Sequence, residues 1–331
     1  MDTSFTLLIL VIVFGLVFEF VNGFHDAANA IATVIATRVL PPWAAVLMAG
    51  VLNFLGAVTG LAVAAAVGQG LVDPSAVTLT TVAAGLLAAI LWDLATWFYG
   101  IPSSSSHALL FGVLGAGVAT NGFGAIIIGG VLKVGFGIVY SPVIGLLAAA
   151  AIVIIIYWIV YRRSPTRVRR TFSRLQLVSS AYMAFSHGGN DGQKTMGIIA
   201  LGLFTYGTYD TFYVPLWVII AAALSLGVGT AAGGFRIVKT MGFKLVTLDS
   251  PHGFAAETAA ASVIELATRF GIPISTTHAI SGAILGVGTA QNRRAVSWGV
   301  ARSIVTAWVL TLPACFILGW ILLKVAAAAG L

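Results

Sequence analysis

The feature of this sequence that most limits its fold is a series of apolar stretches that run unbroken for about 20 residues, the length of a membrane-spanning helix. Hydrophobic residues make up 59% of the chain and charged residues only 8%. Soluble domains carry about a quarter charged residues, so polar side chains here are too few to cover a water-facing surface. In lipid, the backbone polar groups must be satisfied within each segment, as they are in a helix. The sequence therefore predicts an all-α polytopic membrane protein.

Interruptions of the apolar pattern divide the chain into about 10–12 transmembrane segments, some of them re-entrant or broken. Gly-Ile-Pro stands at residues 100–102 and 271–273, and proline suits the first turn of a helix but not its interior. We therefore expect a helix break at each, and a further one at Pro313. The expected segments are residues 5–38, 43–68, 78–99, 101–120, 123–140, 142–161, 175–206, 212–234, 250–270, 272–290 and 296–328.

Positive charge is concentrated in one short stretch. The formal net charge is +7, and the arginines at 162, 163, 167, 169, 170 and 174 lie close together. Clustered basic residues in a short loop mark the cytoplasmic side, so this charge indicates orientation and not a nucleic-acid partner. The N-terminal stretch lacks a basic region and a cleavage site, and we expect a first span there. The single cysteine, Cys315, argues against a disulfide framework or a cysteine-based metal site.

Two polar motifs occur twice and in the same order. Ile101–Ala108 reads IPSSSSHA, and Ile272–Ala279 reads IPISTTHA. Upstream of them, Asn22–Asp26 (NGFHD) matches His187–Asp191 (HGGND). The offsets are 171 and 165 positions, so the two halves correspond along most of their length.

An odd number of crossings in each half gives the two halves opposite orientations in the membrane. The first half crosses the membrane five times if segment 101–120 enters and leaves on the same side of the membrane. We therefore predict inverted repeats at residues 1–161 and 175–331, joined by a basic cytoplasmic linker at 162–174. The same rule places the arginines at 293–294 outside, against the positive-inside trend.

Two aspartates are candidates for a cation site. A charge at mid-membrane costs about 2.5–3.5 kcal/mol even on the mildest scale, so it needs partners or a function. Carboxylate and amide oxygens, with backbone carbonyls freed by glycine, suit a hard cation such as Na⁺. A helix cap would explain one aspartate, whereas duplication favours a site. The predicted residues for Na⁺ or H⁺ are Asn22, Asp26, Asn29, Asn190 and Asp191.

The hydroxyl-rich motifs predict an anion site. Each follows a proline, so its hydroxyls and free backbone N–H groups gather at a helix N-terminus, where the positive end of the dipole favours anions. One such terminus would be an ordinary N-cap with interhelical hydrogen bonds, but two of them facing each other could hold a tetrahedral oxyanion such as phosphate. The residues are Ser103, Ser104, Ser105, Ser106, Ser275, Thr276 and Thr277.

Charge links the two predicted sites. Two carboxylates and a phosphate can share a low-dielectric pocket only if cations neutralise them, so co-binding of a cation is expected. His107 and His278 trail the hydroxyl motifs and support the site, either as proton carriers or as neutral packing groups. Glu257 lies in an apolar segment without a local partner and is expected to bind a cation or act as a gate.

The repeated motifs resemble those of the inorganic phosphate transporter (PiT) family. The resemblance covers nearly the whole chain and rests on Gly23–Ala30 (GFHDAANA), His187–Gly197 (HGGNDGQKTMG), Gly253–Ala261 (GFAAETAAA) and the two Pro-x-Ser-x-x-His motifs. It implies symport of phosphate with Na⁺ or H⁺, an inverted-repeat fold, a homodimer in the lipid bilayer and no enzyme activity. No cofactor beyond the coupling ion is expected.

By position, the resemblance assigns Asp26 and Asp191 to cation and phosphate binding, Ser104 and Ser275 to the hairpin site, and Glu257 to a functional acid. We add Gln193 and Lys194 to the phosphate site. Two positions depart from the family pattern: Asn53 stands where some members have glutamate, and Lys194 matches Asn29 of the first half. The ammonium of Lys194 could replace a bound cation or contact the anion. A short connection between the halves indicates a prokaryotic, multi-pass inner-membrane protein.

Three alternatives remain at this point. A sulfate symporter would keep the mechanism, although acceptors such as Asp26 and Asp191 favour phosphate, which can donate hydrogen bonds. An intramembrane Ser/His hydrolase lacks a nucleophile elbow and would need two active sites. A passive channel does not explain buried acids beside an anion site.

Overall fold

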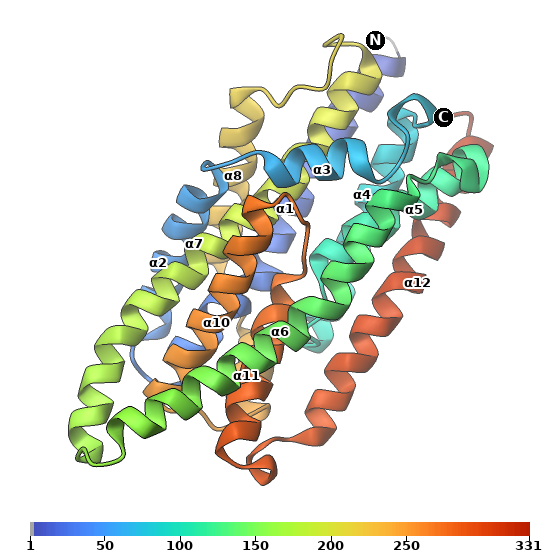
Figure 1. The fold of residues 1–331 in the computed structure, drawn as a ribbon. Coiled ribbons are helices and arrows are strands. Elements are labelled where there is room, and N and C mark those ends of the chain that lie inside the picture. The colour runs from blue at the N-terminus through green and yellow to red at the C-terminus, as the bar shows by residue number, and fades with distance from the viewer. Residues whose placement is uncertain (1–2) are drawn as a thin grey trace.

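The computed structural model describes residues 3–331 and shows an elongated bundle of helices, in which the described residues form no strands (Figure 1). The predicted all-α fold is confirmed. The α-helices are α1 (Thr3–Ala36), α2 (Pro42–Ala57), α3 (Ala62–Gly70), α4 (Leu79–Tyr99), α5 (Ser105–Asn121), α6 (Ile128–Val160), α7 (Pro165–Tyr206), α8 (Leu216–Ala232), α9 (Phe235–Lys239), α10 (Ser250–Arg269), α11 (Thr276–Gln291) and α12 (Trp298–Ala328). Shorter elements are the 3₁₀-helices η1 (Pro74–Ala76), η2 (Gly122–Ala125) and η4 (Arg293–Ala295) and the π-helix η3 (Thr240–Lys244).

The two predicted Gly-Ile-Pro breaks are present and have the same geometry. Gly100 and Gly271 adopt left-handed backbone conformations with φ of 66° and 62°. The next residue in each, Ile101 or Ile272, donates its N–H back to the carbonyl of the residue five positions earlier. This pattern closes a helix C-terminus, and glycine adopts it without the steric cost of a Cβ. The following proline then prevents the helix from continuing.

The chain follows opposite paths in its two halves. In Figure 1, α1 descends, α2 ascends, α4 and α5 descend and return, and α6 descends, whereas α7, α8, α10, α11 and α12 run in the reverse sense. Each helix pair after a bend forms a hairpin whose two ends lie together: an antiparallel bridge joins Val72 to Ile126 in the first half and Val246 to Val296 in the second. The pairs α2–α3 and α8–η3 are each bent, by 70° and 55°. The fold is therefore built from inverted repeats.

Four details differ from the sequence prediction. The segments 123–140 and 142–161 form one helix, α6, which contains Pro142, and Pro313 likewise does not end α12. A proline removes one hydrogen bond, and neighbouring helices compensate for this in a long apolar helix. The predicted linker is helical from Pro165 onward, because proline is favoured in a first helical turn.

The fourth correction concerns the hairpins. The segments 101–120 and 272–290 do not enter and leave on one side by themselves; α4 with α5, and α10 with α11, do so as pairs. The connection after α11 therefore returns to the end that carries the α6–α7 connection (Figure 1). Hydrogen bonds link these segments: Ser297 donates to the carbonyl of Leu245, and Ser250 to that of Arg169. The two arginines in η4 thus lie with the other basic residues, as the positive-inside trend requires.

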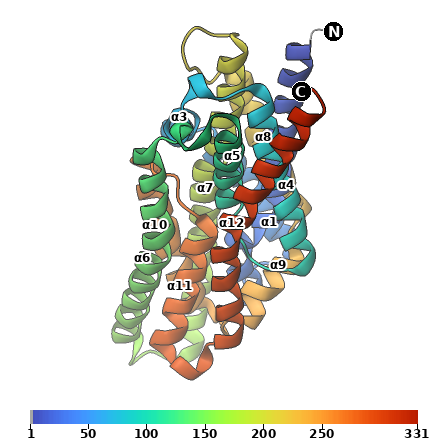
Figure 2. The same cartoon turned by 90° about the vertical axis from the view of Figure 1, so that its right-hand side faces the viewer.

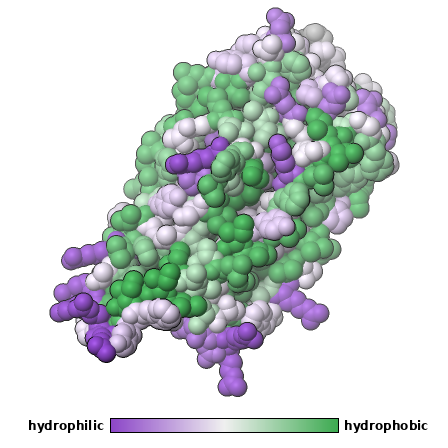
Figure 3. Space-filling view, in the orientation of Figure 1, coloured by the Kyte–Doolittle hydropathy of each residue, from purple (hydrophilic) through white to green (hydrophobic). Residues whose placement is uncertain are grey.

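Length and apolarity identify the helices that could cross a membrane. Among residues 3–331, five helices pass this test singly, and seven spans result if each bent pair counts as one. Green apolar side chains cover most of the face in Figure 3. Purple side chains gather at the lower left, the bottom and the top, and a further purple group interrupts the upper part of the face. The helices α1 and α7 pack against each other, and each also contacts the first helix of its own hairpin, α4 or α10. Figure 2 shows α11 between α6 and α12.

Candidate functional site: a paired aspartate centre

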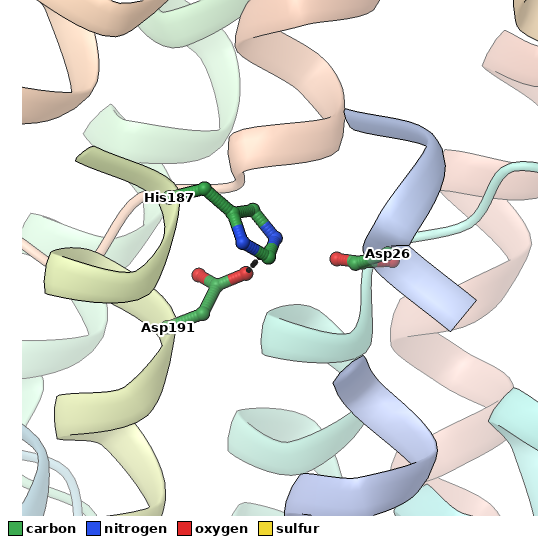
Figure 4. A group of neighbouring side chains, drawn as sticks. All are labelled: Asp26, His187 and Asp191. Atoms are coloured by element: carbon green, nitrogen blue, oxygen red, sulfur yellow. Dashed lines mark ion pairs between the residues drawn. The ribbon is translucent and has the colours of Figure 1, made fainter. Parts of the chain in front are cut away.

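The two aspartates predicted to act together face each other from α1 and α7. Asp26 is 2% exposed and Asp191 1%. Three side-chain atoms that could bind a cation lie within 4.8 Å of one another, one each from Asp26, His187 and Asp191. In Figure 4 the carboxylate of Asp26 points toward the His187–Asp191 pair from the opposite helix. Motifs 165 positions apart in sequence therefore form one buried centre.

Asp26 accepts hydrogen bonds from three residues. His25 Nδ1 lies 2.7 Å from Asp26 Oδ1, and since a carboxylate only accepts, this nitrogen carries the proton. The hydroxyl of Ser105 donates to the same oxygen at 3.3 Å, and that of Thr277 donates to Oδ2 at 3.2 Å. Ser105 belongs to the hairpin of the first half and Thr277 to the hairpin of the second.

Asp191 has the matching arrangement. Thr276 donates to its Oδ2 at 2.9 Å, and Ser106 donates to its Oδ1 at 3.5 Å. His187 Nε2 lies 3.2 Å from Oδ2. Each aspartate thus receives one hydroxyl from its own hairpin and one from the other hairpin. This crosswise pattern ties the two halves together at the centre.

The hydroxyls are held there by the N-termini of α5 and α11. Ser104 and Ser275 cap these helices by accepting from the backbone N–H of His107 and His278. A cap of this type satisfies one free donor and fixes the first turn. The side chains that follow the caps, at 105–106 and 276–277, therefore point to the aspartates. The positive ends of two helix dipoles also meet at this place.

Asn29 and Lys194 occupy matching positions one turn beyond the aspartates and make different contacts. The Asn29 amide donates to Thr276 at 3.2 Å and to Thr277 at 3.0 Å. The Lys194 ammonium donates to Asp191 Oδ1 at 2.5 Å, to the Ser106 hydroxyl at 2.6 Å and to the carbonyl of Ile274 at 2.7 Å. An ion pair therefore lies in the second half of the centre, and a neutral amide in the first.

A second layer of polar residues supports the aspartate helices. His25 Nε2 lies 3.0 Å from the Thr96 hydroxyl, which also accepts from Ser103 at 2.9 Å. In the second half, the residue before the aspartate, Asn190, donates to Thr268 at 2.8 Å. Thr96 and Thr268 end the matching segments DLAT and ELAT. These contacts fix the rotation of α1 and α7 against the hairpins.

The structure does not bring every predicted residue to the centre. Gln193 turns away toward the α2–α3 bend, where its oxygen accepts from Val63 N at 2.9 Å and its nitrogen donates to the carbonyl of Gly189 at 2.6 Å. Asn22 is buried, and within residues 3–331 its side chain forms no hydrogen bond with either aspartate. His107 and His278 lie behind the hydroxyls, with ring centroids 4.6 Å apart in an edge-to-face contact.

Glu257 belongs to a separate buried cluster nearer the basic end. Its carboxylate accepts from Thr33, Gln176 and Ser179, the first and last at 2.5 Å and the second at 3.1 Å. Thr37 in turn donates to Gln176 at 2.9 Å. Thr37 and Arg169 line a cleft of about 570 Å³ at that end of the molecule. Glu257 is therefore connected to the surface cleft and not to the aspartate pair.

Three buried residues at or near the centre are not among the predicted site residues. His25 and His187 stand within the quoted motifs, and their place beside a duplicated aspartate could have marked them. Glu19, fully buried, accepts a hydrogen bond from Thr195 across the α1–α7 contact. No local pattern indicates this contact, because it depends on how the two helices face each other.

Two aspartates and four hydroxyls form a centre that is repeated in the two halves and buried in an apolar helix bundle. This arrangement defines the class of protein as a membrane transporter of the inverted-repeat type. Residues 22–319 match the model of the Phosphate transporter family, and this chain belongs to that family.

Relatives from several bacteria match nearly the whole length of the chain. A "Probable low-affinity inorganic phosphate transporter" of Rhizobium meliloti is 50% identical over 313 residues, 94% of each protein. The protein of the same name from Bacillus subtilis is 40% identical over 322 residues, covering 96% of this chain and 97% of that one. A solved structure titled "The sodium-dependent phosphate transporter" superposes with a TM-score of 0.91 at 25% identity and covers 98% of this chain and 99% of that one.

Proposed function

We propose that this protein carries inorganic phosphate across the cell membrane by symport with Na⁺. The observation that supports this most is the crosswise set of hydroxyls, in which Ser105, Ser106, Thr276 and Thr277 meet two buried aspartates. Hydroxyl groups can turn from the carboxylates to an anion placed between the two helix N-termini, where free N–H groups and the dipoles favour negative charge.

The aspartates select phosphate over sulfate in this proposal. Phosphate at neutral pH carries a proton that it can donate, and Asp26 and Asp191 are acceptors. Sulfate carries none, so each contact with a carboxylate would be repulsive. The rival substrate is therefore disfavoured by a few kcal/mol for each misplaced like charge.

The same aspartates bind the coupling cation. Asp26 and Asp191 with a phosphate between them form a cluster of negative charge that the apolar surroundings tolerate only with positive partners. Oxygen ligands of this kind suit Na⁺, and the similarity to a sodium-dependent transporter favours Na⁺ over H⁺. Since each ligand raises the affinity for the other, the gradient of the cation drives phosphate uptake.

The arrangement of the hairpins supports a mechanism of alternating access. One hairpin opens toward each end of the molecule, and the centre lies where their tips meet (Figure 1). We propose that the halves, residues 1–161 and 175–331, move against each other around this centre; residues 1–2 lie outside the described part of the chain. The Glu257 cluster would then line the path to the basic end as a gate, and Asn22, Asn190 and Gln193 would hold helix positions. We also propose that the protein forms a homodimer in the inner membrane.

Uptake of radiolabelled phosphate into proteoliposomes tests the function. An inward Na⁺ gradient at equal pH is expected to accelerate uptake, an imposed pH gradient without Na⁺ is expected not to, and excess sulfate is expected not to compete. If neither gradient changes the rate of uptake, the symport proposal is wrong. If only the pH gradient drives uptake, H⁺ is the coupling ion. Cross-linking or mass measurement in detergent checks the homodimer.

A further inference from the structure

The strongest unassigned feature is the buried ammonium of Lys194. Its side chain is 2% exposed, although lysine is almost never buried without a partner. An ammonium has three N–H donors, and all three have acceptors within 2.7 Å: a carboxylate, a hydroxyl and a backbone carbonyl. These are the oxygen types that coordinate a hard monovalent cation in proteins.

The matching position in the first half has similar oxygen-bearing neighbours but no positively charged side chain. Asn29 corresponds to Lys194, Asp26 to Asp191 and Thr277 to Ser106, by the offsets of the repeated motifs. Thr277 and Asp26 are hydrogen-bonded at 3.2 Å, as Ser106 and Asp191 are at 3.5 Å. Both halves therefore present a carboxylate and a hydroxyl at the same relative place.

Asn29 also offers an unpartnered oxygen. Its Oδ1 is buried and has no hydrogen-bond partner within residues 3–331. The orientation of the amide is fixed by the network: Thr276 and Thr277 give their protons to the aspartates, so they can only accept from the amide nitrogen. The amide oxygen of Asn29 therefore has no donor. A buried amide oxygen without a donor is costly in free energy unless a cation or water binds it.

We propose that Lys194 is a tethered cation that permanently fills one of two symmetry-related cation sites, so that only the site at Asp26, Asn29 and Thr277 exchanges a coupling ion with solution. This inference rests on the proposed symport. The protein then moves one cation fewer per phosphate than a transporter with asparagine at both positions. The phosphate concentration ratio that it can maintain is correspondingly smaller, because each co-transported cation multiplies this ratio by the concentration ratio of the cation.

The test measures the number of cations coupled to each phosphate. In proteoliposomes, the Na⁺ gradient that just prevents net flux against a fixed phosphate gradient gives this ratio. Lys194→Asn is expected to raise the ratio by one cation per phosphate, and Asn29→Lys to lower it by one. The double exchange Asn29→Lys with Lys194→Asn is expected to restore the original ratio with the roles of the halves reversed. Lys133→Asn, which alters an exposed lysine on α6, should change nothing.

The outcomes separate the two proposals. Absence of phosphate uptake by the unaltered protein would overturn the proposed function. Normal uptake with the same ratio in Lys194→Asn would overturn the tethered cation alone. If Lys194→Asn does not transport, calorimetric titration of the purified protein with NaCl decides the matter: an additional Na⁺ site relative to the unaltered protein supports the proposal, and an unchanged number of sites refutes it.

Discussion

The two halves of the aspartate centre share their caps and their pattern of hydroxyl contacts, and among their differences one pair of positions differs in fixed charge. Asn29 leaves the first half with a carboxylate that no fixed charge neutralises, whereas Lys194 pairs with Asp191 at 2.5 Å. An inverted repeat therefore determines where the ligands lie, but it does not determine whether a positive charge there comes from the chain or from a bound ion. One half keeps an exchangeable charge, and the other contains its own.

The largest expected effect comes from removing each carboxylate. Asp26→Asn and Asp191→Asn should both reduce phosphate uptake by about 30-fold or more, the equivalent of about 2 kcal/mol of lost charge interaction. Only Asp191→Asn leaves a buried ammonium unpaired, which costs about 3–5 kcal/mol of folding stability. Uptake assays and thermal unfolding in detergent measure the two effects. Equal loss of stability in both variants would contradict the difference between the halves.

A second comparison concerns the glycines that let α1 and α7 approach their neighbours. A Cβ on Gly23 would lie 2.5 Å from the carbonyl oxygen of Leu226, and one on Gly188 would lie 2.1 Å from that of Asn53. Gly23→Ala and Gly188→Ala should each destabilise the protein by about 1–3 kcal/mol, with Gly188 the more severe. Gly124→Ala, with no atom within 4 Å of the added methyl, is the control. Unchanged unfolding temperatures in both variants would exclude this close packing.

The helix caps of the two hairpins should behave alike. Ser104→Ala and Ser275→Ala each remove one hydrogen bond to the first turn, so we expect each to cost about 1 kcal/mol of stability. Phosphate affinity should fall less than in Ser105→Ala or Thr276→Val, because the cap hydroxyls turn into their own helices. Equilibrium unfolding and concentration-dependent uptake distinguish the two effects. The variants Ser104→Thr and Ser275→Thr keep the cap and should retain stability.

The smallest expected effect is a difference between the two hairpins in how the stability contribution of a helix cap depends on pH. Thr78 caps α4, and Asp249 caps α10 at the matching position 171 residues later. Burial raises the pKa of Asp249, but hydrogen bonds from His252 and the charges of His252 and Arg169 outweigh it and hold the pKa below its ordinary value. A depressed pKa stabilises the fold above the unfolded value, near 4, and this contribution is lost as the pH falls through the folded value.

Asp249→Asn should therefore remove a small acid-dependent part of stability, about 0.2–1 kcal/mol because the side chain is 61% exposed. The difference in unfolding temperature between this variant and the unaltered protein is expected to shrink as the pH falls below about 4. Thr78→Ala removes the corresponding cap without a titrating group, so its effect should not vary with pH. A pH-independent difference for Asp249→Asn would contradict the assignment.

Sequence determined the parts of this protein that depend on composition and on neighbouring residues. The shortage of charged side chains fixed the lipid environment, and Gly-Ile-Pro fixed both helix breaks, because glycine conformation and the proline ring act within a few residues. The repeated motifs identified Asp26, Asp191 and the four hydroxyls that lie at the centre. They also marked the correspondence between Asn29 and Lys194.

Tertiary structure alone decided which of these groups meet. Crosswise bonding of the hydroxyls depends on the rotation and depth of α5 and α11 against α1 and α7, and no single helix encodes these. For the same reason Glu257 and Gln193, equally plausible in sequence, lie away from the aspartates. Pro142 and Pro313 did not break their helices, since packing compensated for one lost hydrogen bond. Local rules specify backbone conformation, whereas contacts between helices are set by the packing of whole faces.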